Sequence, residues 1–124
     1  MVKILLLMIL LHIINDFNLQ GILANMKQKS WWLKQEGYED FYQDDYKIAL
    51  IIHSLSWAIM ITIPLWILPI HELAITIAVV LNAAIHYYFD DLKCNQMKIN
   101  LYTDQTMHLL QILFTWLILG FCCI

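Results

Sequence analysis

Histidine and aspartate recur at one fixed spacing in an otherwise apolar chain. The three pairs are His12/Asp16, His86/Asp90 and Asp104/His108, and His53 stands alone in a further apolar stretch. Residues four apart lie on the same face of a helix, one turn from each other. Imidazole and carboxylate groups together are typical zinc ligands, and manganese or iron favours sets that are richer in oxygen. The seven residues therefore predict a site for one or two divalent metals, with zinc as the first expectation.

Hydrolysis is the chemistry that such a site most simply supports. A divalent metal lowers the pKa of a bound water to about 7, and a nearby carboxylate can take up the proton as a general base. Asp16 and Asp104 are the candidate catalytic carboxylates. Ligating histidines are usually oriented by further hydrogen-bonding groups. The residues expected to support the ligands or to contact substrate are Gln20, Asn82, Lys93 and Gln105.

The elements that must position these groups follow from composition. Hydrophobic residues make up 61% of the 124 residues and charged residues 14%, against roughly 45–50% and about 25% in ordinary soluble domains. Crossing a bilayer takes roughly 20 mostly apolar helical residues, and four stretches have that length: 2–24, 48–68, 70–92 and 101–124. Backbone groups in lipid must be satisfied internally, so the spans are expected to be helices. The sequence predicts an all-α, single-domain, antiparallel four-helix bundle in a membrane.

Lysine placement predicts the orientation of the bundle. The connections after the first and third spans hold Lys27, Lys29, Lys34, Lys47, Lys93 and Lys98, whereas the amino terminus holds only Lys3. The positive-inside rule places these two connections in the cytoplasm and both termini outside. The first span lacks the small-residue pattern of a cleavage site, so it is expected to be retained. The aromatic and acidic segment 26–46 is expected to lie at the membrane surface.

This orientation places the polar residues in two layers. In each His/Asp pair the aspartate lies nearer the cytoplasm and the histidine about 6 Å deeper, and His53 falls at the depth of the other histidines. Ionisable groups inside a bilayer normally face the bundle interior, pair with one another and mark function. We therefore expect the seven residues to converge near the cytoplasmic leaflet. No nucleic-acid partner is expected, because the chain contains no arginine and no basic patch.

The ordered motifs resemble a known family. His-x3-Asp-Phe-x2-Gln beginning at His12, the lone His53, His-x3-Asp-x2-Lys beginning at His86, and Asp-Gln-x2-His beginning at Asp104 are similar to the pattern of domain of unknown function 3307. The stretch that begins at His12 is followed by Lys27, and the match spans nearly the whole chain. The polar, aromatic first connection departs from the pattern. The resemblance implies a small bacterial or phage polytopic membrane protein, and hence a location in the bacterial inner membrane.

Three classes of function remain open at this point. The first is a metal-dependent hydrolase of a phosphoester or a lipid-linked substrate. The second is a metal-ion or proton transporter or relay, which is less favoured because the outer half of the bundle offers few polar groups for a path. The third is a binding or assembly factor in which metal only holds the helices together. A closed set of four ligands would indicate this third class, and an open coordination position would indicate catalysis. Membrane lipid is the one partner expected in every case.

Overall fold

The computed structural model describes residues 1–122, and their regular secondary structure is entirely helical. The elements are α1 (Val2–Ile13) with a π-helical turn (Ile14–Asn18), the short helices α2 (Leu23–Met26), α3 (Lys29–Trp32) and α4 (Tyr38–Phe41), α5 (Asp45–Thr62) with a 3-10 turn (Ile63–Leu65), α6 (Glu72–Cys94), and α7 (Leu101–Leu117) with a π-helical turn (Ile118–Cys122). The prediction of an all-α chain is confirmed.

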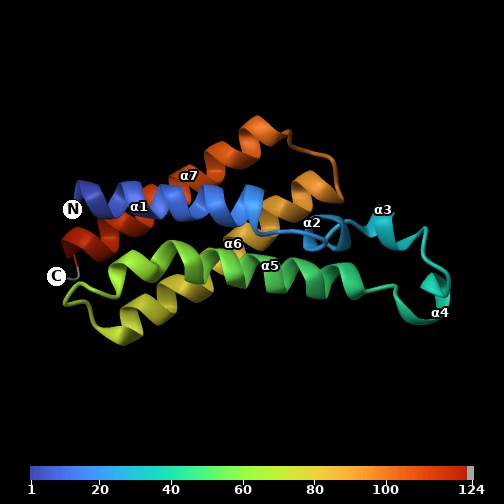
Figure 1. Ribbon diagram of the computed structural model, residues 1–124, viewed down its shortest axis with the longest axis horizontal. Helices are drawn as coiled ribbons and strands as arrows, with labels where there is room; N and C mark the ends of the chain where they lie inside the picture. The colour runs from blue at the N-terminus through green and yellow to red at the C-terminus, as the bar shows by residue number, and fades with distance from the viewer. Residues whose placement is uncertain (123–124) are drawn as a thin grey trace.

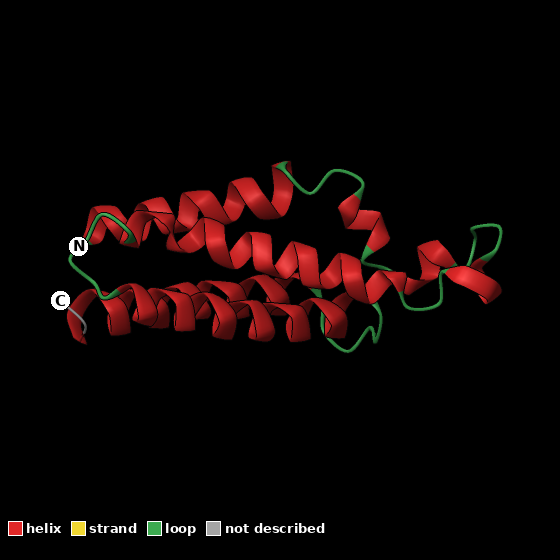
Figure 2. Cartoon of the chain, turned by 90° about the horizontal axis from the view of Figure 1, so that it is seen from below, coloured by secondary structure: helices red, strands yellow, loops and turns green. Residues whose placement is uncertain are grey.

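The four long helices, α1, α5, α6 and α7, run alternately in opposite directions (Figure 1). Both termini lie at the end of the molecule that also holds the connection between α5 and α6. The other end holds α2, α3 and α4 and the connection between α6 and α7 (Figures 1 and 2). α5 packs against α6 and α1, and α7 packs against α6 and α1. Every long helix therefore reaches the interior of one bundle.

Local sequence sets where α5, α6 and α7 begin or end. The α5 helix gives way to a 3-10 turn around Pro64, because proline has no N–H to continue the hydrogen-bond ladder. The side chain of His71 accepts a hydrogen bond from the Leu73 N–H at the start of α6, and Asn100 Oδ1 accepts one from the Thr103 N–H at the start of α7. The cap at Asn100 places Asp104 in the first full turn of α7.

The first expected span, 2–24, is not one helix. The helix stops at Asn18, and Gly21 has a left-handed φ of 53°, after which the separate helix α2 begins. The π-helical turn that ends the span brings both Asn15 and Asp16 into the interior. Such wide turns inside α-helices are often found at functional sites. Sequence periodicity alone could not show this turn.

The other expected spans shift by a few residues. Helical structure covers Asp45–Leu65 and Glu72–Cys94 in place of 48–68 and 70–92, and the last span is helical over residues 101–122, with 123–124 outside the described residues. The segments Asp45–Leu65 and Glu72–Cys94 are long and apolar enough to cross a membrane, by length and composition. Two of the four predicted spans therefore pass this test of length and composition in the described residues.

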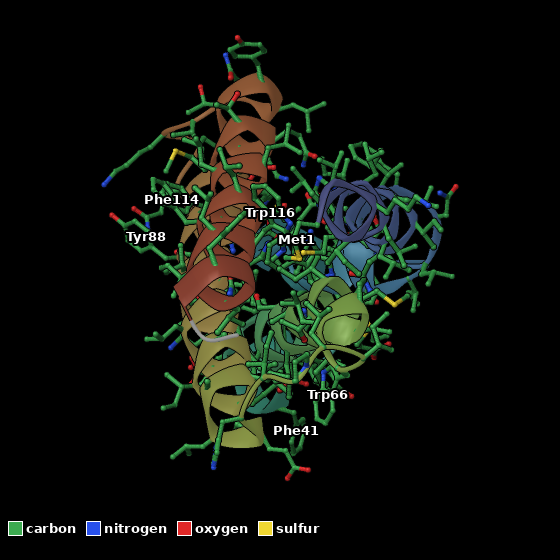
Figure 3. The ribbon with its side chains drawn as sticks, turned by 90° about the vertical axis from the view of Figure 1, so that its left-hand side faces the viewer. Met1, Phe41, Trp66, Tyr88, Phe114 and Trp116 are labelled. Atoms are coloured by element: carbon green, nitrogen blue, oxygen red, sulfur yellow. The ribbon has the colours of Figure 1, made fainter. Side chains whose placement is uncertain are left out.

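Polar and apolar residues are distributed in an unusual way. The apolar core includes Met8, Trp57, Ile61 and Ile112, but fourteen polar or charged residues are buried as well. Large apolar side chains meanwhile cover the outside of the long helices. Figure 3 shows Trp66, Tyr88 and Phe114 at the periphery of the bundle, where each is more than half exposed. The interior is therefore richer in polar groups than the surface of the long helices.

Candidate metal centre

Six of the seven predicted ligands meet inside the bundle. They come from four different elements and form three overlapping groups whose ligand atoms lie within 4.8 Å of one another: Asp16/His53/His86, His86/Asp90/His108 and Asp16/Asp104/His108. All six side chains are buried. Each of these groups could hold a metal ion. The convergence expected from the spacing of the pairs and from the matching depth of His53 is present for these six residues.

His53 lies at the centre of the first group. Its Nε2 atom is 3.1 Å from His86 Nε2, 3.3 Å from Asp16 Oδ1 and 3.3 Å from Asp90 Oδ2. Two neutral imidazoles can place at most one proton each among these four atoms. The group is consequently rich in lone pairs and poor in donors, which is the composition of a cation site.

His108 forms the centre of a second group. Its Nε2 atom is 3.2 Å from Asp104 Oδ1 and 3.4 Å from Asp90 Oδ1, and these three atoms are buried without a hydrogen-bond partner. The other ring nitrogen, Nδ1, lies 3.3 Å from Gln111 Oε1. Because an amide oxygen can only accept, the contact places a proton on Nδ1, so in the neutral ring Nε2 keeps its lone pair. With a neutral His108, three acceptors then face one another.

Two lysines complete the electrostatics of the cluster. Lys27 Nζ lies 2.6 Å from Asp90 Oδ2, and its side chain is only 5% exposed. Lys93 donates a hydrogen bond to Asp104 and lies 3.6 Å from Asp90 Oδ1. A buried charge is costly unless it is paired. The two ammonium groups thus compensate much of the charge of three aspartates that would otherwise repel one another.

His12, the seventh predicted ligand, belongs to none of the three groups. Trp57 Nε1 donates to His12 Nδ1 at 2.8 Å, and His12 Nε2 lies 3.1 Å from Gln105 Oε1. Gln105 Nε2 in turn donates to Asp16 Oδ2 at 2.8 Å and to Asp104 Oδ2 at 3.1 Å. Both ring nitrogens of His12 are therefore engaged, and its geometry is that of a group that orients two carboxylates through Gln105.

The remaining predicted supporting residues also lie at the cluster or next to it. Gln20 donates to Asp16 Oδ1 at 3.2 Å. Asn82 donates to Thr115 Oγ1 at 2.8 Å, and its backbone oxygen accepts from Gln111 Nε2 at 3.1 Å. This second network fixes the orientation of the Gln111 amide and hence the proton position on His108. Gln20 thus contacts the cluster directly, and Asn82 reaches His108 through Gln111.

Three contributors were missed when the sequence was interpreted. Trp57 is fully buried, and its ring stacks on His86 with centroids 4.2 Å apart; it follows His53 by four residues, the same spacing that pairs His with Asp elsewhere. Lys27 was counted only as a topology signal, although it belongs to the resemblance motif. Gln111 follows His108 by three residues, so the helical period could have placed it beside that histidine.

A cavity of about 600 Å³ lies between α6 and α7, within the usual range for small-molecule sites of roughly 300–1,000 Å³. Its walls are apolar and include Ala78, Leu81 and Phe114, and Asn82 and Gln111 also line it. Gln111 contacts His108. The cavity therefore extends to Gln111, the residue that contacts His108 of the cluster.

Comparisons of this chain with protein-family models, with curated proteins and with solved structures find no match. The resemblance to domain of unknown function 3307 stays a prediction from the motifs.

Proposed function

We propose that the chain is an integral-membrane protein whose His/Asp cluster holds divalent metal, zinc or alternatively manganese or iron, and hydrolyses a phosphoester or lipid-linked substrate. The observation that carries the proposal is the set of buried, unpartnered acceptors around His108 Nε2, Asp90 Oδ1 and Asp104 Oδ1. Unsatisfied buried polar atoms cost free energy. A cation between them would remove that cost.

The distribution of side chains supports a membrane location. Monomeric soluble proteins rarely expose large contiguous apolar patches, whereas Leu6, Ile52, Val80 and Phe114 on the four long helices are all at least half exposed. Two of these helices have the length and composition of membrane spans. The lysine-rich connections lie together at one end and the termini at the other (Figure 1). This arrangement fits a four-helix bundle in the bacterial inner membrane with both termini outside.

An apolar core favours hydrolysis over transport. The buried residues nearer the termini are mainly apolar and include Met8, Ile61, Leu65 and Leu119. An ion path from the cluster to that end of the bundle would have to cross this core, where charged species are costly. A site that opens to one side suits an enzyme acting on substrate from the cytoplasm or the adjoining leaflet.

Lys93 and the α6–α7 cavity suit a lipid-linked anionic substrate. The Lys93 side chain is 21% exposed, whereas those of Asp90 and Asp104 are fully buried, so Lys93 connects the cluster to the surface. An ammonium group binds phosphoryl oxygens well. The apolar cavity could take the hydrocarbon part of the same molecule.

Each group in the cluster then has a defined task. A divalent metal held by the His/Asp groups would supply Lewis-acid activation of water near neutral pH. Asp16 and Asp104 each have one carboxylate oxygen among the candidate metal ligands, and the other oxygen of each accepts a hydrogen bond from Gln105. Either carboxylate can therefore hold a proton removed from water. Lys93 orients the anionic group of the substrate. Trp57 and His12 keep Gln105, and through it both carboxylates, in position.

The test is the metal content and phosphoesterase activity of detergent-purified chain without a histidine tag, measured by mass spectrometry and by release of phosphate or alcohol. We expect stoichiometric metal, and we expect His86→Ala to lose metal and activity together. His71→Asn is the matched control, because it changes an exposed histidine and retains a side chain that can cap α6. A metal-free wild-type protein would overturn the proposal. Metal without activity on any phosphoester would favour the assembly factor.

A further inference from the structure

We infer that the cluster is built for two cations and that Asp90 bridges them. The inference rests on the proposed function, because it assumes that the cluster holds metal. It is carried by the way in which the two oxygens of a single carboxylate divide the cluster: Asp90 Oδ2 accepts from Lys27 and also faces His53 and His86, and Asp90 Oδ1 faces His108.

The first position has four potential ligands. A cation held tetrahedrally by bonds of about 2.0–2.1 Å needs ligand atoms about 3.3–3.4 Å apart. His53 Nε2 lies 3.1 Å from His86 Nε2 and 3.3 Å from an oxygen of Asp16 and of Asp90. His86 Nε2 lies 4.0 Å from the same Asp16 oxygen and 3.8 Å from the same Asp90 oxygen. The three His53 distances match the tetrahedral spacing to within about 0.3 Å, and the two His86 distances would have to shorten by about 0.4–0.7 Å for all four atoms to hold one cation.

The second position has three potential ligands, from His108, Asp104 and Asp90. His108 Nε2 is 3.2 Å from Asp104 Oδ1 and 3.4 Å from Asp90 Oδ1, which again fits the ligand spacing of a small cation. Lys93 also adjoins this position: its ammonium lies 3.6 Å from Asp90 Oδ1 and has no lone pair to offer a metal. We expect the fourth ligand, water or substrate, to enter beside Lys93, whose side chain is 21% exposed.

The charge of the cluster supports two cations acting on an anion. Asp16, Asp90 and Asp104 with Lys27 and Lys93 carry a net charge of −1 when the histidines are neutral. Two dications would change this to +3, an attractive site for a phosphoryl group. Paired metals about 3.5–4 Å apart are a recurrent arrangement in phosphoryl hydrolysis, because they stabilise both the attacking and the leaving oxygen. The substrate class this implies is a phosphate ester.

The experiment uses the whole chain in detergent, stripped with a chelator and reloaded with Zn²⁺ or Mn²⁺. Mass spectrometry measures metal per chain, and electron paramagnetic resonance of the Mn²⁺ form measures magnetic coupling between ions that share a bridging carboxylate. We expect two metals per wild-type chain and a coupled Mn²⁺ spectrum. Asp104→Asn and His53→Gln should each retain one metal and give an uncoupled spectrum, and Asp90→Asn should lose the coupling. His71→Asn should keep both ions.

The outcomes separate this inference from the proposed function. Saturation at one metal per wild-type chain would overturn the bridge and leave a mononuclear metal centre standing. Two metals without coupling would also overturn the bridge, and no metal at all would overturn both proposals. If Asp90→Asn does not fold, Asp104→Asn and His53→Gln still decide the question, because each alters only one position. Circular dichroism and gel filtration in detergent check the fold of every variant.

Discussion

At the scale of single residues, the cluster depends on groups that never face its centre. Trp57 donates to His12, His12 contacts Gln105, and Gln105 donates to Asp16 and Asp104. This chain of contacts ties the positions of two carboxylates to the indole N–H of one buried tryptophan. Removal of such an indirect support typically lowers metal affinity or activity by about 10–100-fold.

Trp57→Phe tests this chain, because phenylalanine keeps a ring to stack on His86 but cannot donate to His12. We expect the variant to bind Zn²⁺ about 10–100-fold more weakly than the wild type, measured by competition with a chromogenic chelator. Trp66→Phe is the control, since Trp66 is exposed and should leave the affinity unchanged. Equal affinity in both variants would show that His12 has no orienting role.

Lys27 provides a second test at the same scale. Breaking a buried ion pair by removing one partner costs about 3–5 kcal/mol, and Lys27→Gln would leave Asp90 without its ammonium partner. The metal-free variant should therefore unfold at a lower temperature than the metal-free wild type, and saturating Zn²⁺ should narrow the difference by supplying positive charge. Differential scanning fluorimetry in detergent measures both. Lys34→Gln, at an exposed position, should change neither value, and a Zn²⁺-independent loss at Lys27 would argue against metal near Asp90.

Part of the candidate site could be predicted from the sequence, and there are physical reasons why the remaining contacts could not. The i, i+4 spacing identified five of the six residues that meet, because a helix brings such pairs to one face, and the sixth, His53, was predicted from its depth in the second apolar stretch. The pairing of Lys27 with Asp90, 63 positions away, is a tertiary contact that no local pattern contains. His12 has the right spacing, but the N–H of Trp57 occupies one of its two nitrogens.

At the scale of elements, the interior geometry follows from how α1 ends and how α6 and α7 diverge. Hydropathy could locate all four long helices, but it extended the first one past Asn18, where a π-helical turn and Gly21 end it. The same turn brings Asp16 to the cluster. The apolar cavity between α6 and α7 includes Gln111 in its lining.

Filling the α6–α7 cavity should separate lipid recognition from metal binding. Ala78→Phe places a large ring in the cavity, and we expect metal content to remain at the wild-type level while hydrolysis of a long-chain lipid phosphoester falls roughly tenfold, as a change of about 1.4 kcal/mol in transition-state binding would give. A short-chain ester with the same head group should be hydrolysed at the wild-type rate. Leu73→Phe, exposed near the start of α6, is the matched control. An equal loss on both esters would mean that the cavity does not hold the chain of the substrate.

At the scale of the whole molecule, buried polar groups gather around the His/Asp cluster, and apolar side chains cover the outside of the long helices. Figure 3 shows the end of the bundle that holds the termini, where Met1 lies beside Trp116 and where Trp66 and Phe114 lie at the periphery. Trp116 Nε1 donates to the Met1 backbone oxygen at 3.0 Å. The composition predicted this distribution, because a chain with 61% hydrophobic residues cannot bury all of them in a bundle of four helices.

Orientation in the membrane is the prediction that belongs to this scale. Two single-cysteine variants, Ile67→Cys and Gln96→Cys, are made in a chain whose native cysteines have been replaced. Ile67 lies in the connection near the termini and Gln96 in the connection between α6 and α7, and both residues are exposed. A membrane-impermeant maleimide should label Ile67→Cys in intact cells and Gln96→Cys only after the membrane is opened, as the lysine bias implies. The reverse pattern would place the cluster at the external face.

The distribution of the cluster over the helices also sets an order in time. Asp16, His53, His86 and Asp90, the residues of the first position, all precede the connection between α6 and α7, whereas the second position takes Asp104 and His108 from α7. A chain grows from its amino end at about 5–20 residues per second. During synthesis the first position can therefore form while α7 is still being made, and the second position can form only after α7 has packed. Under the proposed function, hydrolytic activity would then arise only when the last helix is in place.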